Sequence, residues 1–155
     1  METTDQNAQQ ASKITADILH SLGFECTVDI ASTTPEEISL AISGPDCRFI
    51  IGDGGSRLDD LQYLVNRLLV ASCETAPRVR VDCDGYRAKA EDRLIHSAIE
   101  KAKRVIATGH SITLPPMNAY HRRLVHSSLA EIPGVRTQSE EVDSRFKRIV
   151  ISPSA

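Results

Sequence analysis

Long hydrophobic runs are absent from this chain of 155 residues. No apolar stretch approaches the roughly 20 residues that a membrane-spanning helix needs. The opening sequence METTDQNAQQ is polar and acidic, whereas a secretory signal begins with basic and then apolar residues. We therefore expect a cytoplasmic protein with no membrane insertion. With 41% hydrophobic residues, the chain can still build the core of one domain or of two small ones.

Metal-binding and catalytic motifs are absent as well. The four cysteines are irregularly spaced, without a CxxC pair: Cys26, Cys47, Cys73 and Cys83. Neither a zinc site nor a disulfide framework is indicated, so we expect small, partly buried free thiols. The five histidines lack metal-ligand spacing, and no nucleophile elbow or phosphate-loop motif appears. We predict a protein that is not an enzyme, with no catalytic residue, no metal and no cofactor.

Charge is divided unevenly along the chain, although the net charge is only −3. Residues 1–76 carry four basic and twelve acidic side chains, a net charge of −8. Residues 77–155 carry fourteen basic and nine acidic side chains, a net charge of +5. This division favours an anionic partner that contacts mainly the second part of the chain. Chance variation in solvated surface charge is the alternative explanation.

The hydrophobic pattern up to residue 109 predicts a small α/β unit. Residues 1–11 are polar and lack periodicity, which is typical of a mobile tail. A short apolar segment, 47–51, precedes a glycine-rich loop. The periodicity elsewhere predicts long helices and strands: helices at 12–22, 56–69 and 88–108, and strands at 24–31, 37–43 and 79–83. The predicted order is αββααβα, and Gly109 stops the last helix.

A second compact unit is expected from about residue 110. Residues 117–130 have the apolar spacing of a helix, which Pro133-Gly134 ends. Two strands, 135–139 and 145–152, are predicted to follow. The fold class predicted for the whole chain is α/β (α+β).

The loop Gly52-Asp53-Gly54-Gly55 fits the GxxG pattern of KH domains, in which glycines let the backbone approach nucleotide phosphates. An ordinary glycine-rich connection between helices has the same composition. The loop lies between a short apolar segment and a long amphipathic helix that a strand follows, and this position favours the KH interpretation.

Arg122 and His126 are four residues apart, which places them on one face of the predicted helix. Such a pair can grip one phosphate or stack on a base, although a solvated helix face often holds the same two residue types. Arg145, Lys147 and Arg148 lie on a strand expected to pack beside this helix, which favours the nucleic-acid interpretation. We expect both Arg122 and His126 to be exposed, because apolar neighbours can fill the buried face: Leu124, Val125 and Leu129.

Several separated motifs resemble the Jag family of bacterial proteins, the SpoIIIJ-associated proteins, also called KhpB or EloR. The segment IIGDGGSRLDDLQYLVNRLL is similar to the family's KH signature, and VDCDGYRAKAEDRL is similar to the strand, turn and helix that follow it. LPPMNAYHRRLVHSSL resembles the start of the family's Arg-x-x-x-His domain, with Arg122 and His126 as the two namesake residues. VRTQSEEVDSRFKRIVISP resembles its closing strands, so that the resemblance covers about residues 12–153.

The resemblance implies a type-II-like KH domain at 12–109 and an Arg-x-x-x-His domain at 110–155, after a disordered tail at 1–11. It implies a non-catalytic protein that binds single-stranded RNA, with single-stranded DNA as an alternative ligand. The implied role is regulation of gene expression after transcription, or regulation of cell elongation and cell shape. A second small KH protein is a further candidate partner. The expected contacts lie chiefly in the second domain, with the KH loop as a secondary site: Arg122, Arg123, His126, Arg145, Lys147 and Arg148, then Gly52, Asp53, Gly54, Gly55 and Arg57.

Some positions depart from the family pattern. Basic residues are usual at the two variable loop positions, where this chain has Asp53 and Gly54, and an acid there repels phosphate. Ala90 replaces a common basic residue, and His121 replaces a usual Glu. Jag proteins also often carry an N-terminal domain that these 155 residues do not include. The acidic first part keeps a second interpretation open, a protein-interaction module that docks another KH protein or a cell-envelope factor.

Aromatic side chains for base stacking are scarce, since the chain holds three Tyr, three Phe and no Trp. Tyr120 is the best placed of them for a base to stack on. We therefore expect modest affinity and broad tolerance of RNA sequence.

Overall fold

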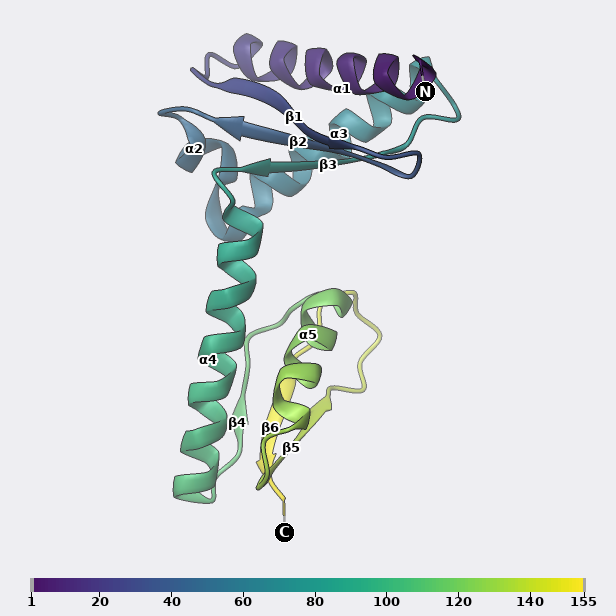
Figure 1. Ribbon diagram of the computed structural model, residues 1–155. Helices are drawn as coiled ribbons and strands as arrows, with labels where there is room; N and C mark the ends of the chain where they lie inside the picture. The colour runs from purple at the N-terminus through teal and green to yellow at the C-terminus, as the bar shows by residue number, and fades with distance from the viewer. Residues whose placement is uncertain (1, 155) are drawn as a thin grey trace. The chain divides into compact units, whose positions relative to one another are not determined.

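The computed structural model describes residues 2–154, which fall into two compact units, Met1–Arg87 and Ala88–Ala155 (Figure 1). Each unit has a three-stranded sheet with helices packed on it. The predicted α/β fold class is confirmed. Among the helices of the described residues, none is long and apolar enough to cross a membrane.

The first unit has the element order and strand pairing of a type-II KH domain. Its sheet order is β1-β2-β3, with β1 antiparallel to β2 and β2 parallel to β3. A parallel pair needs a long crossover connection, and here the crossover contains the glycine loop. The elements are α1 (Glu2–Ser21), β1 (Thr27–Thr33), β2 (Glu37–Ser43), α2 (Cys47–Ile51), the 3₁₀ turn η1 (Asp53–Gly55), α3 (Ser56–Ser72) and β3 (Arg78–Cys83).

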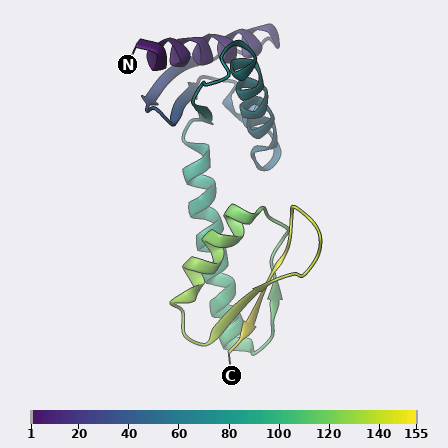
Figure 2. The same cartoon turned by 90° about the vertical axis from the view of Figure 1, so that its right-hand side faces the viewer.

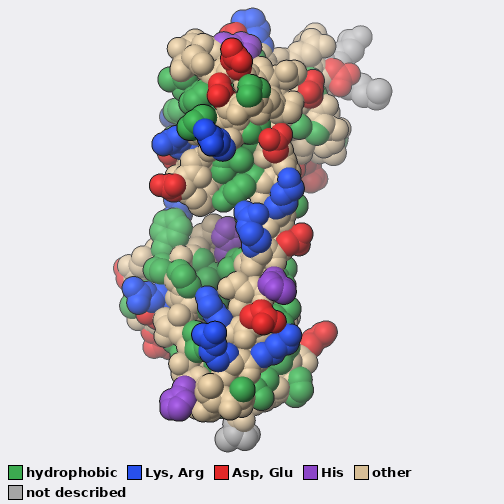
Figure 3. Space-filling model, turned by 90° about the vertical axis from the view of Figure 1, so that its left-hand side faces the viewer, with side chains coloured by type: hydrophobic (Ala, Val, Ile, Leu, Met, Phe, Trp, Pro, Cys, Tyr) green, Lys and Arg blue, Asp and Glu red, His purple; other side chains and the backbone are tan. Residues whose placement is uncertain are grey.

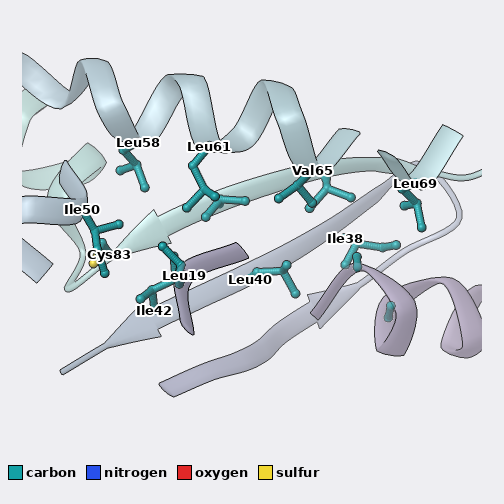
Figure 4. Close-up of a cluster of buried hydrophobic side chains, with 14 of the residues drawn as sticks. Leu19, Ile38, Leu40, Ile42, Ile50, Leu58, Leu61, Val65, Leu69 and Cys83 are labelled. Atoms are coloured by element: carbon teal, nitrogen blue, oxygen red, sulfur yellow. The ribbon is translucent and has the colours of Figure 1, made fainter. Parts of the chain in front are cut away.

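The core of the first unit lies between the sheet and the helices (Figure 4). Every second side chain of β2 and β3 is buried, as the alternation of a strand requires: Ile38, Leu40, Ile42, Val79, Val81 and Cys83. Helix α3 turns one apolar face toward these strands, with residues spaced by three and four: Leu58, Leu61, Val65 and Leu69. The glycine loop is therefore joined to a well-packed helix.

Residues 2–11, expected to be a mobile tail, form the first half of α1 instead. Ala8 and Ala11 are buried, and the hydroxyl of the buried Thr15 donates to the Ala11 carbonyl oxygen at 2.8 Å. The helix packs against β1 and α3. Alanine favours helix formation and lets a helix approach its neighbours closely, but it adds little to a hydrophobic pattern, which is why the pattern misses this segment.

Two of the four cysteines are paired, contrary to the expectation of free thiols. Cys47, at the start of α2, forms a disulfide with Cys83, at the end of β3, and their Cα atoms are 6.0 Å apart. Cys26 and Cys73 are free. The paired residues are separated by 36 positions in the chain. Only the crossover between β2 and β3 brings them together, so their spacing carried no signal of the bond.

The second unit packs two helices against one face of an antiparallel sheet (Figure 2). Its elements are α4 (Tyr86–Thr108), which starts at the end of the first unit, β4 (Ile112–Thr113), α5 (Ala119–Ala130), β5 (Val135–Ser139) and β6 (Ile149–Pro153). Strand β6 lies between β4 and β5 and is antiparallel to both. The core comes from both helices, the central strand and the segment between β4 and α5: Ala98, Ala102, Val105, Leu114, Met117, Val125, Leu129, Ile149 and Ile151.

The second unit begins earlier in the chain than expected. The sequence pattern assigns α4 to the KH domain, with a new domain from residue 110, yet the buried side chains of α4 belong to the second core. The unit therefore starts at Ala88. A helix stop such as Gly109 marks the end of an element and does not reveal which core the element joins. Strand β6 also begins later than predicted, at Ile149, and Lys147 is joined to Met117 by an isolated antiparallel bridge.

Candidate nucleic-acid interface

Helix α5 carries Arg122 and His126 one turn apart, as their spacing predicts. Asn118 caps the helix, because its side-chain oxygen accepts a hydrogen bond from the His121 backbone N–H at 2.9 Å. The buried Val125 sets which face of the helix meets the sheet. Arg122 and His126 are half-buried, which differs from the expectation that both are exposed.

The Arg122 guanidinium connects the start of α5 to the segment before β6. Its Nη1 donates to the carbonyl oxygen of Met117 at 2.8 Å and to that of Arg145 at 3.4 Å. Hydrogen bonds from a charged donor are stronger than those between neutral groups. One side chain thus holds residues 145–148, called here the basic segment, against the helix.

Backbone contacts also order the basic segment. Lys147 and Met117 exchange N–H···O bonds of 2.9 and 3.1 Å. The Arg148 N–H donates to the Glu140 carboxylate at 3.2 Å, and the Arg148 carbonyl oxygen accepts from the Glu140 N–H at 3.0 Å. The side chains of Arg145 and Arg148 remain exposed, and that of Lys147 is half-buried. The segment therefore presents cations from a fixed backbone.

Five basic side chains come from these two connected stretches of chain: Arg122, Arg123, Arg145, Lys147 and Arg148. Lys13 pairs with Asp17, Arg87 with Asp59, and Lys103 with Glu100, and none of these residues belongs to the cluster. The second unit has eleven basic and seven acidic residues, a net charge of +4. Figure 3 shows the side of this unit that carries α4, where Lys and Arg side chains lie among Asp, Glu and His side chains. The charge of the five-residue cluster, called here the Arg122 surface, is thus available to an anion.

His126 is held by two hydroxyl groups of β5. Its Nδ1 lies 2.5 Å from Thr137 Oγ1, and its Nε2 lies 3.0 Å from Ser139 Oγ. Burial, and then the positive charge of Arg122, lower the pKa of His126 below its ordinary value. Both effects favour the uncharged ring, and both ring nitrogens already have partners. This geometry favours a role in positioning α5 on β5 over a direct charge contact with phosphate.

Tyr120 and Phe146 lie beside the Arg122 surface, and the sequence pattern predicts only Tyr120 as a ring for stacking. Tyr120 is exposed, and its ring centroid lies 5.6 Å from that of His121. Phe146 is 53% exposed, and the Arg145 guanidinium lies over its ring, 5.7 Å from the centroid. The adjacent Arg-Phe pair in the sequence is the signal that identifies this ring.

The GDGG loop of the KH domain is a tight turn that requires glycine at two positions. Gly52 has a φ of 69° and Gly55 a φ of 80°, a backbone region that side chains disfavour. A Cβ on Gly52 would lie 2.7 Å from Cγ of Arg57, and a Cβ on Gly55 would lie 2.8 Å from the Tyr86 ring. These two glycines let the loop pack closely, while the variable positions of the loop, Asp53 and Gly54, are exposed.

Positive charge near the loop comes from Arg48 and Arg57. The Arg57 Nη1 donates to the Phe49 carbonyl oxygen at 2.9 Å, so the end of this side chain contacts the backbone of α2. The Arg48 guanidinium lies 4.5 Å from the centroid of the Phe49 ring. Asp53 opposes these charges, and the first unit has seven basic and fourteen acidic residues, a net charge of −7. The loop therefore attracts anions less than the Arg122 surface does.

The outer edge of β3 is occupied by side chains of the same unit. The Asn66 amide accepts from the Val79 N–H and donates to the Val79 carbonyl oxygen, both at 2.8 Å. Gln62 accepts from the Val81 N–H at 3.0 Å, and Arg87 Nε donates to the Val81 carbonyl oxygen at 2.9 Å. These bonds use the backbone groups that an added strand or a base would need. The β3 edge is therefore less available to a partner than the loop and the helices of this unit.

Metal-ligating side chains do not gather within the residues described: no group of three or more His, Cys, Asp or Glu could hold a metal ion. The candidate interface consists of cations, loop glycines and aromatic rings.

Comparison with known proteins identifies an Arg-x-x-x-His domain at residues 92–153. The chain is 34% identical over 128 residues to the RNA-binding protein KhpB of Clostridium symbiosum, an alignment that covers 81% of this chain and 57% of that protein. It is 28% identical over 122 residues to the RNA-binding protein KhpB of Bacillus subtilis (strain 168), covering 79% and 58%. With KhpB of Lactiplantibacillus plantarum the identity is 34% over 94 residues, covering 61% and 29%. The chain spans a little more than half the length of the first two relatives.

The fold and the site together define the class of protein, a type-II KH domain followed by an Arg-x-x-x-His domain that carries a basic surface. The resemblance in the sequence motifs is confirmed by these comparisons. The chain belongs to the Jag family over the region that it shares with the KhpB proteins.

Proposed function

We propose that this chain binds single-stranded RNA without catalysing a reaction, chiefly through the Arg122 surface. The observation that supports this most strongly is the Arg122 guanidinium, which bonds to Met117 and Arg145 and so holds the basic segment beside α5. Binding groups whose backbone is already ordered lose less conformational freedom on association. The relatives that share this region are named RNA-binding proteins.

In this proposal the KH loop is a secondary contact. The exposed tip at Asp53 and Gly54 brings backbone near a passing phosphate, but the Asp53 carboxylate reduces the attraction. Arg57 contributes charge, although one of its nitrogens is bonded to Phe49. His126 acts through position, since its ring is hydrogen-bonded to Thr137 and Ser139.

Binding that depends on charge tolerates many RNA sequences and is sensitive to salt. This property suits a cytoplasmic regulator that acts on RNA after transcription. Control of cell elongation and shape is the alternative role. Single-stranded DNA offers the same phosphates and is the competing ligand. Crosslinking the tagged protein in cells and sequencing the bound nucleic acid distinguishes the two.

The test of the RNA function is a salt titration with a labelled, unstructured RNA, followed by fluorescence anisotropy. The variant carries Arg123→Glu, Arg145→Glu and Arg148→Glu, three exposed positions whose replacement spares the core. We expect affinity to fall by about 100-fold or more at low salt, and the log–log salt slope to fall by about 0.7 for each lost phosphate contact. Lys13→Ala, on the surface of α1, is the control for loss of a basic side chain outside the proposed surface. Unchanged binding by the triple variant would refute the proposed surface.

A second candidate function is docking of another small KH protein through α3. Tyr63 is 66% exposed on this helix, and Leu64 and Leu68 are also exposed. An exposed apolar helix face is a common site of protein association. In this view the acidic first unit is a protein-binding module, and a cell-envelope factor is the alternative partner.

Co-purification with a small KH protein from the same cell tests the docking function. Leu64→Glu places a charge on the exposed face while sparing the buried residues of α3. We expect it to abolish co-elution in size-exclusion chromatography and to leave RNA affinity unchanged. Co-elution that survives this change would exclude the α3 face.

A further inference from the structure

The two exposed phenylalanines of this chain are built alike. Phe49 is 43% exposed and Phe146 is 53% exposed, whereas Phe24 packs against the first core. Each exposed ring follows an arginine whose guanidinium lies over it, Arg48 at 4.5 Å from the Phe49 centroid and Arg145 at 5.7 Å from the Phe146 centroid. A single exposed ring needs no explanation, but the repeated pairing with a cation does.

Each ring is also fixed beside a candidate phosphate contact. Phe49 lies on α2, three residues before Gly52, and its carbonyl oxygen accepts from Arg57 Nη1 at 2.9 Å. Phe146 lies in the basic segment, whose backbone Arg122 bonds at the preceding carbonyl. In both units an arginine of the candidate site therefore holds the backbone at or next to the ring.

An aromatic ring with a guanidinium on one face leaves its other face for a nucleobase. Stacking on such rings is tolerant of base identity, because every base has a π-face, and arginine adds a cation–π contribution. The same guanidinium remains able to attract the phosphate that flanks the stacked base. The Arg-Phe pair thus combines a phosphate contact with base stacking, and a duplex offers only the first because it hides its base faces.

We infer that Phe49 and Phe146 are base-stacking residues, one in each unit, which select unpaired bases over duplex or abasic backbone. This inference rests on the proposed RNA function and adds a specificity to it. It assigns base recognition to aromatic rings, whereas the proposed function assigns affinity to cations. Base stacking by the rings and RNA binding by the cations can therefore be refuted by different experiments.

Tryptophan fluorescence reports stacking directly, because the chain has no native Trp. Phe49→Trp and Phe146→Trp each introduce one reporter at one ring, and Leu22→Trp places a reporter at an exposed position outside both sites. On addition of an unstructured single-stranded RNA, we expect quenching at positions 49 and 146 and none at position 22. If anisotropy shows binding while a site reporter is not quenched, stacking at that ring is refuted.

Affinity measurements distinguish the contribution of the RNA bases from that of the sugar-phosphate backbone. We expect Phe146→Ala and Phe49→Ala each to weaken binding of single-stranded RNA about fivefold or more, with Phe→Trp variants retaining affinity and Leu22→Ala unchanged. The wild-type chain should bind an abasic strand, or a duplex of equal length, more weakly than the single strand at the same salt concentration. Equal affinity for the abasic strand overturns the stacking inference and leaves the proposed function standing. A wild-type chain that binds none of these oligomers overturns both.

Discussion

The two units share a plan, a three-stranded sheet with helices on one face, but they use a central arginine in different ways. In the KH unit, Arg87 forms an ion pair with Asp59 at 2.7 Å and bonds Gln62 and the Val81 carbonyl. In the Arg-x-x-x-His unit, Arg122 bonds to the backbone carbonyls of Met117 and Arg145. A carboxylate neutralises a guanidinium, whereas carbonyl oxygens leave its net charge intact. The difference teaches that the first arginine is structural and that the second can order its surroundings and still attract an anion.

The net charges of the two units differ in the same direction as the roles of these two arginines. The KH unit carries −7 and the Arg-x-x-x-His unit +4. The long-range field therefore brings a polyanion to the Arg-x-x-x-His unit first. In the proposed function, the KH unit then contributes contacts that do not depend on net charge, such as the loop backbone and the Phe49 ring.

The largest expected effect is on the stability of the KH unit. Asn66→Ala leaves the N–H and the carbonyl of the buried Val79 without their partner. Unsatisfied buried groups of this kind cost about 1–3 kcal/mol each, so the free energy of unfolding should fall by about 2 kcal/mol or more in thermal or denaturant unfolding. Ser72→Ala, on the same helix, is the control and should change it by less than about 0.5 kcal/mol. An unchanged melting temperature would mean that the β3 edge is open to other partners.

The second effect is on RNA affinity and tests the contrast between the two arginines. Arg122→Ala removes a cation and frees the basic segment, so affinity should fall about tenfold for unrelated RNAs, with a salt slope lower by roughly one contact. Arg87→Ala should lower the melting temperature and leave affinity nearly unchanged, because Arg87 is already paired with Asp59. Anisotropy and thermal unfolding of both variants decide the matter. If Arg87→Ala weakens RNA binding as much as Arg122→Ala does, the proposed difference between the two arginines is refuted.

Local features of the molecule could be predicted from the sequence. The apolar spacing of α3 and the alternation in β2 and β3 predict their buried faces, because periodicity is a property of neighbouring residues. The spacing of Arg122 and His126 likewise predicts a shared helix face. Features that depend on contacts between residues distant in the sequence could not be predicted from such local patterns.

Three such features show the physical reason. The partners of His126 lie on β5, 11 and 13 residues further on, so its burial depends on how that strand packs. The Cys47–Cys83 pair depends on the crossover between strands. The allocation of α4 to the second core depends on which sheet buries its apolar face. In each case the determining neighbour is distant in sequence, and no local pattern records it.

A smaller effect concerns pH and the role of His126. Because its folded-state pKa is lowered, the unfolded chain binds this proton more readily, and stability falls as pH drops through about 6.5 toward the lower folded value. His126→Gln should flatten this loss between pH 7.5 and 5.5 in unfolding experiments. The ratio of variant to wild-type RNA affinity should stay constant over the same range. A wild-type advantage that grows below pH 6.5 would instead show that the charged ring contacts phosphate.

The smallest expected effect comes from Asp53 and measures how near the KH loop lies to the bound strand. Asp53→Lys replaces an exposed acid by a base at the loop tip, where its charge attracts any phosphate within roughly the Debye length, about 10 Å at 0.1 M salt. Affinity should rise about two- to fivefold at low salt and by less at high salt, because added ions screen an exposed charge. Asp53→Asn, which removes the acid without adding a base, should give an intermediate gain. The gain should persist in the triple variant of the Arg122 surface if the loop contacts RNA independently. Equal affinities of all three loop forms at every salt concentration would place the loop off the RNA path and would strengthen the docking function of the KH unit.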